Sequence, residues 1–249
     1  MGEVKKEGYK SMPPRLSQRL TALVEMLAEG AKEPYPVVCD VGCDHGWIAI
    51  TLCLKNVAER VIASDVREGP LDRAREHVAE CGLAGRIDTV LSDGLSHVGE
   101  DQARAAVIAG MGGFLIRDII LEAQGRQALP DILILQPQNG YPEVRMTLRD
   151  LGYGIEKETM VREDGKYYVI LRAVKGADSS AAGKAGPEDT EVRDSFGGYL
   201  LDHRDPVLLE YLQREKEKFT GIVSRAPQGT DEAKARLGEI EKAMQYWEV

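Results

Sequence analysis

Short apolar segments that alternate with amphipathic ones are the feature of this sequence that most constrains its fold. Apolar runs bounded by glycine or polar residues occupy positions 36–41, 61–64, 87–91, 105–109 and 132–135. Between them lie segments with helical periodicity, such as residues 71–81 and 114–123. This alternation predicts a parallel sheet covered by helices on both faces.

Different patterns precede and follow this series. Leucine and valine recur at helical spacing from Leu16 to Leu27, which predicts a first helix over residues 14–29. Two extended runs, residues 153–162 and 167–173, flank the sequence EDGK, and Asp-Gly is typical of a hairpin turn. We therefore expect an antiparallel pair of strands at one edge of the sheet.

The last part of the chain has a different composition. Residues 175–191 are small and polar, as in a linker. Apolar positions spaced four and three apart then recur from Leu208 to Ile222 and from Ala233 to Trp247. They predict two helices that fold back as a coiled-coil hairpin or as an ordinary helical hairpin. The predicted units are a first domain over residues 1–174, a linker over 175–191 and a helical domain over 192–249.

Length, charge and cysteine content limit the class of protein. A chain of 249 residues suits one large and one smaller domain. No apolar run approaches the roughly 18–20 residues of a membrane helix, and residues 1–20 lack the apolar segment of a secretion signal. We expect a monomer in the cytoplasm, not bound to a membrane. Because Cys39, Cys43, Cys53 and Cys81 form no CxxC pair, we expect reduced thiols and no metal.

An acidic loop containing glycine, DVGCDHG at residues 40–46, follows the first strand. Gly42 and Gly46 permit a tight turn at the carboxyl end of a strand, where open sheets bind cofactors. The second strand ends at Asp65, an acid placed to accept hydrogen bonds from ribose hydroxyls. The acids of the loop would repel a pyrophosphate, whereas the sulfonium and amino groups of S-adenosylmethionine tolerate nearby carboxylates. The sequence therefore predicts S-adenosylmethionine as cofactor.

Two further strands end in matching segments. Ser92-Asp93-Gly94 offers short polar groups to an adenine amine, and the glycine-rich loop after the fourth strand leaves room for a substrate near the methyl group. The residues that we expect to contact the cofactor are Asp40, Gly42, Asp44, His45, Asp65, Val66, Ser92, Asp93, Gly94, Gly110, Met111 and Gly112.

The segments DVGCDHGWIAI, ASDVREGPLDRAREHV, LSDGL, IAGMGG, LILQPQN and EDGKYYVIL together resemble the bacterial tRNA adenine-N1 methyltransferases that act on adenine 22. The resemblance covers about residues 15–172. It implies an α/β fold with a Rossmann-like methyltransferase sheet, S-adenosylmethionine as donor, tRNA as acceptor and a coiled-coil-like C-terminal domain that assists tRNA binding. Members of the family read QPN where this chain reads QPQN, so the register of Asn139 is open.

Methylation of adenine at N1 requires the base to leave its stack, because N1 lies on the Watson–Crick edge. Gln136 and Asn139 offer donors and acceptors to that edge. Asp44 is placed to hold the N6 amine or to stabilise the developing cation, unless it binds the amino group of the donor. We therefore predict Asp44, Asn139 and Gln136 as catalytic residues.

Local positive charge offers contacts for tRNA in a chain whose net charge is -9. Residues 1–20 contain five basic and two acidic side chains, and two arginines lie one turn apart after the QPQN loop. The predicted phosphate contacts are Arg15, Arg19, Arg145 and Arg149. The alternative for these arginines is a solvated helix face. Two other functions stay open: a methyltransferase for another RNA or a small molecule, and a binding module without catalysis.

Overall fold

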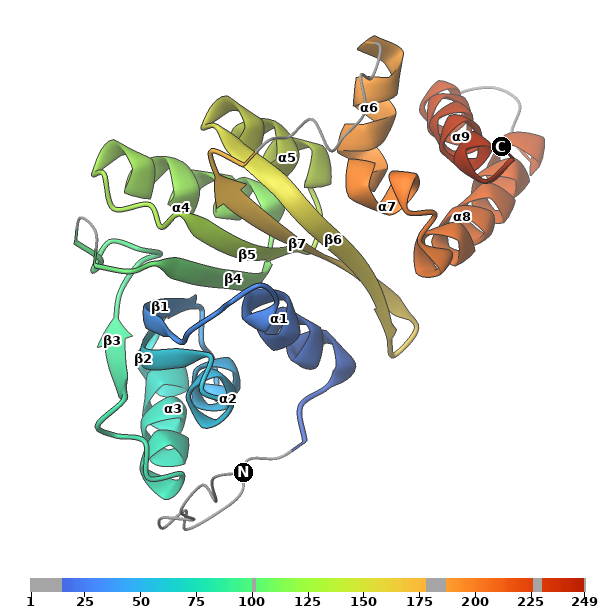
Figure 1. Cartoon of the computed structure of the whole chain (residues 1–249). Coiled ribbons are helices and arrows are strands. Elements are labelled where there is room, and N and C mark those ends of the chain that lie inside the picture. The colour runs from blue at the N-terminus through green and yellow to red at the C-terminus, as the bar shows by residue number, and fades with distance from the viewer. Residues whose placement is uncertain (1–14, 100–101, 178–186, 226–229, 249) are drawn as a thin grey trace.

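A seven-stranded sheet forms the centre of the protein (Figure 1). The computed structural model describes residues 15–99, 102–177, 187–225 and 230–248. The strands are β1 (Tyr35–Val41), β2 (Ala58–Asp65), β3 (Ile87–Leu91), β4 (Ala105–Met111), β5 (Ile132–Pro137), β6 (Tyr153–Glu163) and β7 (Lys166–Lys175). Their order is β3-β2-β1-β4-β5-β7-β6. The first five strands pair in parallel, and β7 pairs antiparallel with both β5 and β6. The predicted Rossmann-like sheet with an antiparallel hairpin at one edge is confirmed.

Helices cover both faces of this sheet. The covering helices are α1 (Gln18–Ala28), α2 (Trp47–Leu54), α3 (Glu68–Glu80), α4 (Gly113–Gly125) and α5 (Tyr141–Asp150). The C-terminal helices are α6 (Pro187–Phe196), α7 (Gly198–Asp202), α8 (Pro206–Arg225) and α9 (Asp231–Met244). Val107 of β4 packs in one core with α1, α2 and α3, whereas its neighbour Ile108 packs in the other core with α4 and α5. Alternate residues of the central strands thus serve opposite faces, which explains their continuous apolar sequence.

The first helix starts later than its prediction. The Ser17 hydroxyl accepts a hydrogen bond from the Leu20 amide at 3.3 Å, so this serine caps α1. The predicted start at residue 14 lies outside the described residues. Arg172 of β7 holds the other end of α1, since its Nη1 donates to the Met26 carbonyl at 3.2 Å.

The C-terminal helices form the predicted hairpin of α8 and α9, reached through α6 and α7 (Figure 1). The segment predicted as a linker is shorter than 175–191, because α6 already begins at Pro187; residues 178–186 lie outside the described ones. Leu208, Leu212 and Ile240 are buried in the same apolar core as α4 and α5. Ile222, at the far end of the predicted stripe, is 41% exposed. The hairpin thus packs on the sheet domain at one end, and a true coiled coil stays a prediction.

Three properties of the described residues bear on function. In the described part of the chain, no helix is long and apolar enough to cross a membrane. All four cysteines are free thiols in the interior, and burial raises the pKa of the Cys39 thiol to about 12. The structure groups no three potential metal ligands among the residues that it describes.

Candidate functional site

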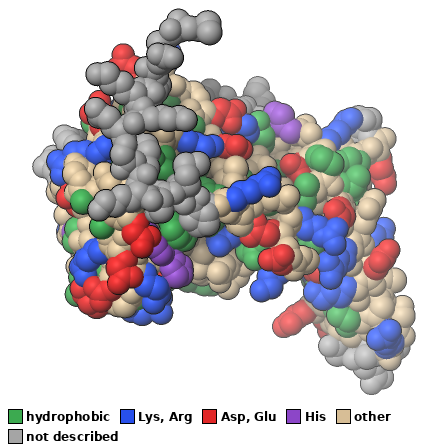
Figure 2. All heavy atoms as spheres, turned by 90° about the horizontal axis from the view of Figure 1, so that it is seen from below, with side chains coloured by type: hydrophobic (Ala, Val, Ile, Leu, Met, Phe, Trp, Pro, Cys, Tyr) green, Lys and Arg blue, Asp and Glu red, His purple; other side chains and the backbone are tan. Residues whose placement is uncertain are grey.

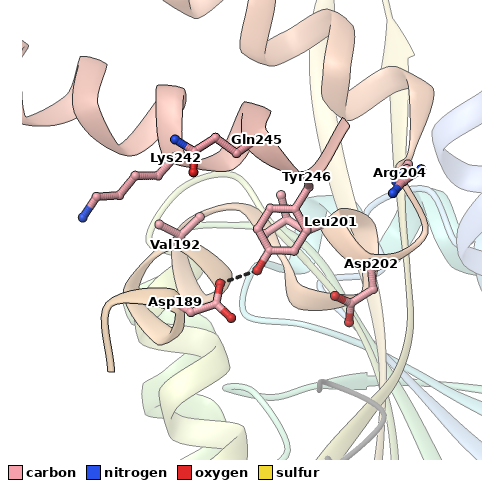
Figure 3. Close-up of a pocket in the computed structure, with 8 residues that line it drawn as sticks. All are labelled: Asp189, Val192, Leu201, Asp202, Arg204, Lys242, Gln245 and Tyr246. Carbon is pink, nitrogen blue, oxygen red and sulfur yellow. Dashed lines mark hydrogen bonds between the residues drawn. The ribbon is translucent and has the colours of Figure 1, made fainter. Parts of the chain in front are cut away.

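A cavity of about 590 Å³ opens at the carboxyl ends of β1, β2 and β4. With the exception of Gly112, all the residues predicted to contact the cofactor line it. A second hollow of about 680 Å³ lies among α6, α7 and α9 (Figure 3). None of the predicted site residues lines that hollow. Within its lining the Tyr246 hydroxyl donates to Asp189, and Asp202 forms a paired salt bridge with Arg193.

Asp40 forms part of the inner wall of the cavity and is 2% exposed. Its Oδ2 accepts a hydrogen bond from the Ala49 amide of α2 at 3.2 Å, so the carboxylate ties β1 to that helix. Burial raises the pKa of Asp40 to about 7, with a further contribution from the negative charge of Asp65. The acid predicted for cofactor binding therefore also shapes the loop that precedes α2.

The glycines of the loop are required by its geometry. Gly42 has φ of +73°, and a Cβ there would lie 2.4 Å from the end of the Met111 side chain. Gly46 has φ of +74°, and a Cβ would lie 3.1 Å from the Ala74 Cβ of α3. Gly110, the residue before the last of β4, has φ of +75°. These positions leave backbone open to close approach by a ligand.

Asp65 ends β2 at the opposite side of the loop and is 6% exposed. Its Oδ1 accepts from the Arg67 amide at 3.0 Å, and its carboxylate lines the cavity. At the end of β3, the Ser92 hydroxyl shares hydrogen bonds with Ser96 Oγ and His97 Nδ1, both at 2.9 Å. An acid at the end of the second strand, a polar group after the third and glycines at the ends of β1 and β4 fit the ribose, adenine and sulfonium of S-adenosylmethionine.

Asp44 lies at the mouth of the cavity, with 58% of its side chain exposed. It adopts a left-handed conformation with φ of +48°. Its Oδ1 accepts from Arg73 Nη2 at 3.3 Å, and its Oδ2 lies 3.5 Å from His45 Nε2. Arg73 and His45 thus hold the carboxylate at the rim of the cavity.

Gln136 differs from its predicted role. The side chain is fully buried, its Oε1 accepts from Arg19 Nη1 at 2.8 Å, and its Nε2 donates to the Pro137 carbonyl at 3.1 Å. An amide engaged in this way does not present a free donor and acceptor to the edge of a base. Gln136 instead fixes the Arg19 side chain, which does line the cavity.

The QPQN loop places Gln138, rather than Asn139, in the lining of the cavity. Asn139 is exposed, and its Oδ1 accepts from the Gly113 amide at 3.2 Å, at the start of α4. A Cβ at Gly112 would lie 3.3 Å from that same Oδ1, so the loop packs closely on the glycines. The catalytic roles of Asp44 and Asn139 stay predictions, and Gln138 joins them as a candidate.

The four arginines predicted for phosphate contact fall into different environments. Arg145 is 3% exposed, and its Nη2 lies 2.7 Å from Glu158 Oε1, so its predicted contact with tRNA is wrong. Arg149 is half exposed and forms a paired hydrogen bond with Asp194 at 3.0 and 2.9 Å. Arg19 turns into the cavity, whereas Arg15 is exposed ahead of α1.

Tyr168 lines the cavity and was missed by the sequence reasoning. Arg19 Cζ lies 5.2 Å from the centre of its ring. The alternation of residues along the predicted strand could have indicated it. Alternate residues of β7 share a face, so Tyr168 faces the same side as Arg172, which contacts α1. The pairing of Leu135 with Leu171 then brings Tyr168 level with the loop after β5.

Comparison with known proteins agrees with this site. Residues 38–248 match the model of the family described as tRNA (adenine(22)-N(1))-methyltransferase. The Bacillus subtilis protein of that description is 30% identical over 234 residues, which cover 93% of this chain and 94% of that protein. Its crystal structure, of the m1A22 tRNA methyltransferase TrmK, superposes with a TM-score of 0.76 at 30% identity over 93% and 97% of the two chains.

A second solved structure is that of a Streptococcus pneumoniae protein in complex with S-adenosyl-L-methionine. It is 30% identical, covers 92% of this chain and all of its own, and superposes with a TM-score of 0.78. The family match extends through the C-terminal helices as well as the sheet. This chain therefore belongs to the tRNA (adenine(22)-N(1))-methyltransferase family.

Proposed function

We propose that the chain transfers a methyl group from S-adenosylmethionine to N1 of adenine 22 in tRNA. The observation that supports this most is the cavity at the strand ends, in which inward acids and glycines surround a space beside the QPQN loop. Family membership supports the same reaction. The proposal includes a monomer that acts in the cytoplasm.

The chain's own residues have distinct tasks in this reaction. The cofactor, when bound, supplies an electrophilic methyl group. Asp65 accepts hydrogen bonds from the ribose hydroxyls, and Leu115 and Ile119 of α4 add an apolar wall that excludes water. Neutral adenine N1 needs no deprotonation, so alignment supplies much of the rate. Asp44 at the rim holds the N6 amine or stabilises the cation that forms on the base.

Binding of tRNA relies on a few placed cations rather than on net charge. Figure 2 shows acidic and basic side chains interspersed over the face in view, with Lys and Arg gathered near the C-terminal helices. Of the predicted phosphate contacts, Arg15 and Arg19 have no acid partner for their guanidinium groups in the described part of the structure, and Arg15 is the exposed one of the two. We expect binding that is strongly weakened by salt.

The test is to incubate the chain with labelled S-adenosylmethionine and unmodified total tRNA. Nucleoside analysis and primer-extension stops then locate the methyl group. The proposal expects N1-methyladenosine at position 22 and a large loss of rate in Asp44→Asn. Methylation of another RNA or of a small molecule would favour the first alternative. Cofactor binding without turnover on any tRNA would favour a binding module.

A further inference from the structure

Two large apolar side chains are exposed together on the first turn of α4. Phe114 is 56% exposed, and its neighbour Leu115 is 50% exposed. Leu115 lines the cavity at the strand ends, whereas Phe114 is not part of that lining. Adjacent exposed apolar residues beside a binding site are typical of a contact with a ligand or partner. We therefore looked for the part of the substrate that meets Phe114 outside the cavity.

The residues next to Phe114 fix its place at the cavity rim. Gly113 packs so closely on the QPQN loop that a Cβ there would lie 2.5 Å from the Asn139 carbonyl oxygen. A Cβ on Gly140 would lie 3.7 Å from the Phe114 amide nitrogen. Helical side chains lean toward the start of their helix, and α4 starts at the sheet edge where the cavity opens. The Phe114 ring therefore stands beside the QPQN loop, outside the cavity.

A cation holds one side of this ring. Arg117, one turn along α4, has its Cζ 5.1 Å from the centre of the Phe114 ring. The guanidinium is itself fixed, because Nη1 donates to Glu143 Oε1 and Nε donates to Asp118 Oδ1, both at 2.8 Å. More than half of Phe114 still faces solvent. A planar ring that is held on one side and open on the other suits stacking with a nucleobase.

Methylation at N1 creates a need for such a ring. Adenine 22 has to leave its stack to bring N1 to the cofactor, and this unstacking costs free energy. The base beside it in the tRNA then loses a stacking partner and remains outside the cavity. Because Phe114 also lies outside the cavity, the base that reaches the ring is this neighbour rather than the adenine inside.

We propose that Phe114 stacks on the nucleobase next to adenine 22 and replaces the contact that the extruded adenine gives up. This inference rests on the proposed function of the chain. The ring stabilises the tRNA with its adenine extruded and takes no part in the transfer of the methyl group. Leu115 continues the apolar surface from the ring into the cavity, where the adenine enters.

The test measures methylation of intact tRNA and of two tRNAs with an abasic site on one or the other side of adenine 22. On intact tRNA, Phe114→Ala lowers kcat/KM by roughly 5–100-fold, the effect of one lost base–aromatic stack. Where the abasic site removes the base that Phe114 contacts, parent and variant agree within about twofold. Where it lies on the other side, the full loss persists. The affinity for S-adenosylhomocysteine, measured by calorimetry, is the same in parent and variant.

Three further variants separate stacking from other roles of the side chain. Phe114→Tyr retains the planar ring and most of the rate, whereas Phe114→Leu retains an apolar side chain without the ring and loses most of it. The matched control is Leu121→Ala, which removes another exposed apolar side chain of α4, two turns along and outside the cavity lining. This control leaves kcat/KM unchanged on all three tRNAs.

The outcomes that overturn the inference are distinct from those that refute the proposed function. Equal losses for Phe114→Ala on all three tRNAs would mean that the ring supports the start of α4 or contacts adenine 22 itself, and the inference would fail. Unchanged kcat/KM on intact tRNA would also overturn it. A parent chain that methylates no tRNA would instead refute the proposed function, and the inference would fall with it.

Discussion

Arg19 and Arg145 are two arginines that turn inward, and they differ in what surrounds them. Arg145 of α5 is enclosed by protein: Nε and Nη2 face Glu158 Oε1, and Nη1 donates to the Asp194 carbonyl of α6 at 2.7 Å. Arg19 has one bonded nitrogen, and its remaining donors border a cavity. A buried arginine with protein on every side joins elements, whereas one with spare donors beside a cavity is available to a ligand.

The largest effect is expected from breaking the buried ion pair of Arg145 and Glu158. Glu158→Gln or Arg145→Met leaves an uncompensated charge or an unpaired group at the contact of α5, β6 and α6, and we expect a loss of about 3–5 kcal/mol in the free energy of unfolding. Urea denaturation measures it. Arg149→Met, which removes a half-exposed pair one turn away, serves as control and costs about 1 kcal/mol or less. Similar losses in Arg145→Met and Arg149→Met would contradict the distinction between the buried ion pair and the half-exposed one.

A smaller effect is expected from Gly197, which packs against the same ion pair. Gly197 has φ of +96°, and a Cβ would lie 2.4 Å from Glu158 Oε2. Gly197→Ala therefore displaces the ion pair as well as straining the backbone, at a cost of about 2–3 kcal/mol. Gly152→Ala is the control, since Gly152 has φ of +76° but no atom within 4 Å of a built Cβ. It costs only the backbone strain of about 1 kcal/mol.

On the cavity side of the comparison, Asp40 forms no salt bridge with any of the described basic side chains. Burial raises the folded-state pKa of Asp40 from 3.8 to about 7, so between these values the folded chain binds the proton more tightly than the unfolded one. Stability relative to Asp40→Asn, which retains the acceptor for the Ala49 amide, should fall by on the order of 2 kcal/mol as pH rises from 4 to 7. The difference levels off about one pH unit above the folded-state pKa, at roughly pH 8. A difference that rises with pH would show that Asp40 is ionised in the folded protein throughout.

The smallest effect concerns Tyr168. Removing the ring under the Arg19 guanidinium in Tyr168→Leu costs about 0.5–1 kcal/mol of stability, whereas Tyr168→Phe retains the cation–π contact and costs less. Thermal denaturation of the two variants measures this. A loss as large as that of Arg145→Met would show that the contact of Tyr168 with Arg19 mainly stabilises the fold, as the contacts of Arg145 do. The contrast between Arg19 and Arg145 would then disappear.

Sequence patterns predicted the strands and the cavity because both depend on local signals. Apolar runs that end in acids and glycines fix which residues meet at the carboxyl edge of the sheet, and Asp65 and Gly42 lie there. The burial of Arg145 could not be predicted from such local patterns. Its spacing from Arg149 places both on one face of α5, but the side to which that face turns depends on Glu158 and Asp194, 13 and 49 positions along the chain from Arg145.

The same limit applies to Gln138 and Asn139. Both polar side chains follow β5, and only the packing of Gly113 against the loop decides that Asn139 turns toward α4 while Gln138 borders the cavity. Arg19 was predicted to contact tRNA at the surface, because no local pattern indicates its partner Gln136, which lies 117 positions away. Charge alone does not reveal which arginine will be held inside.

The attachment of α1 to the last strands of the sheet also sets an order of events during synthesis. Arg19 and Met26 near the start of the chain are held by Glu163 and Arg172, across sequence separations of 144 and 146 residues. Contacts this distant form late, after the intervening chain has been made and has folded. A nascent chain that ends before the β6–β7 hairpin thus lacks the anchor for its first helix, and the cavity reaches its final form only when nearly the whole sheet domain has left the ribosome.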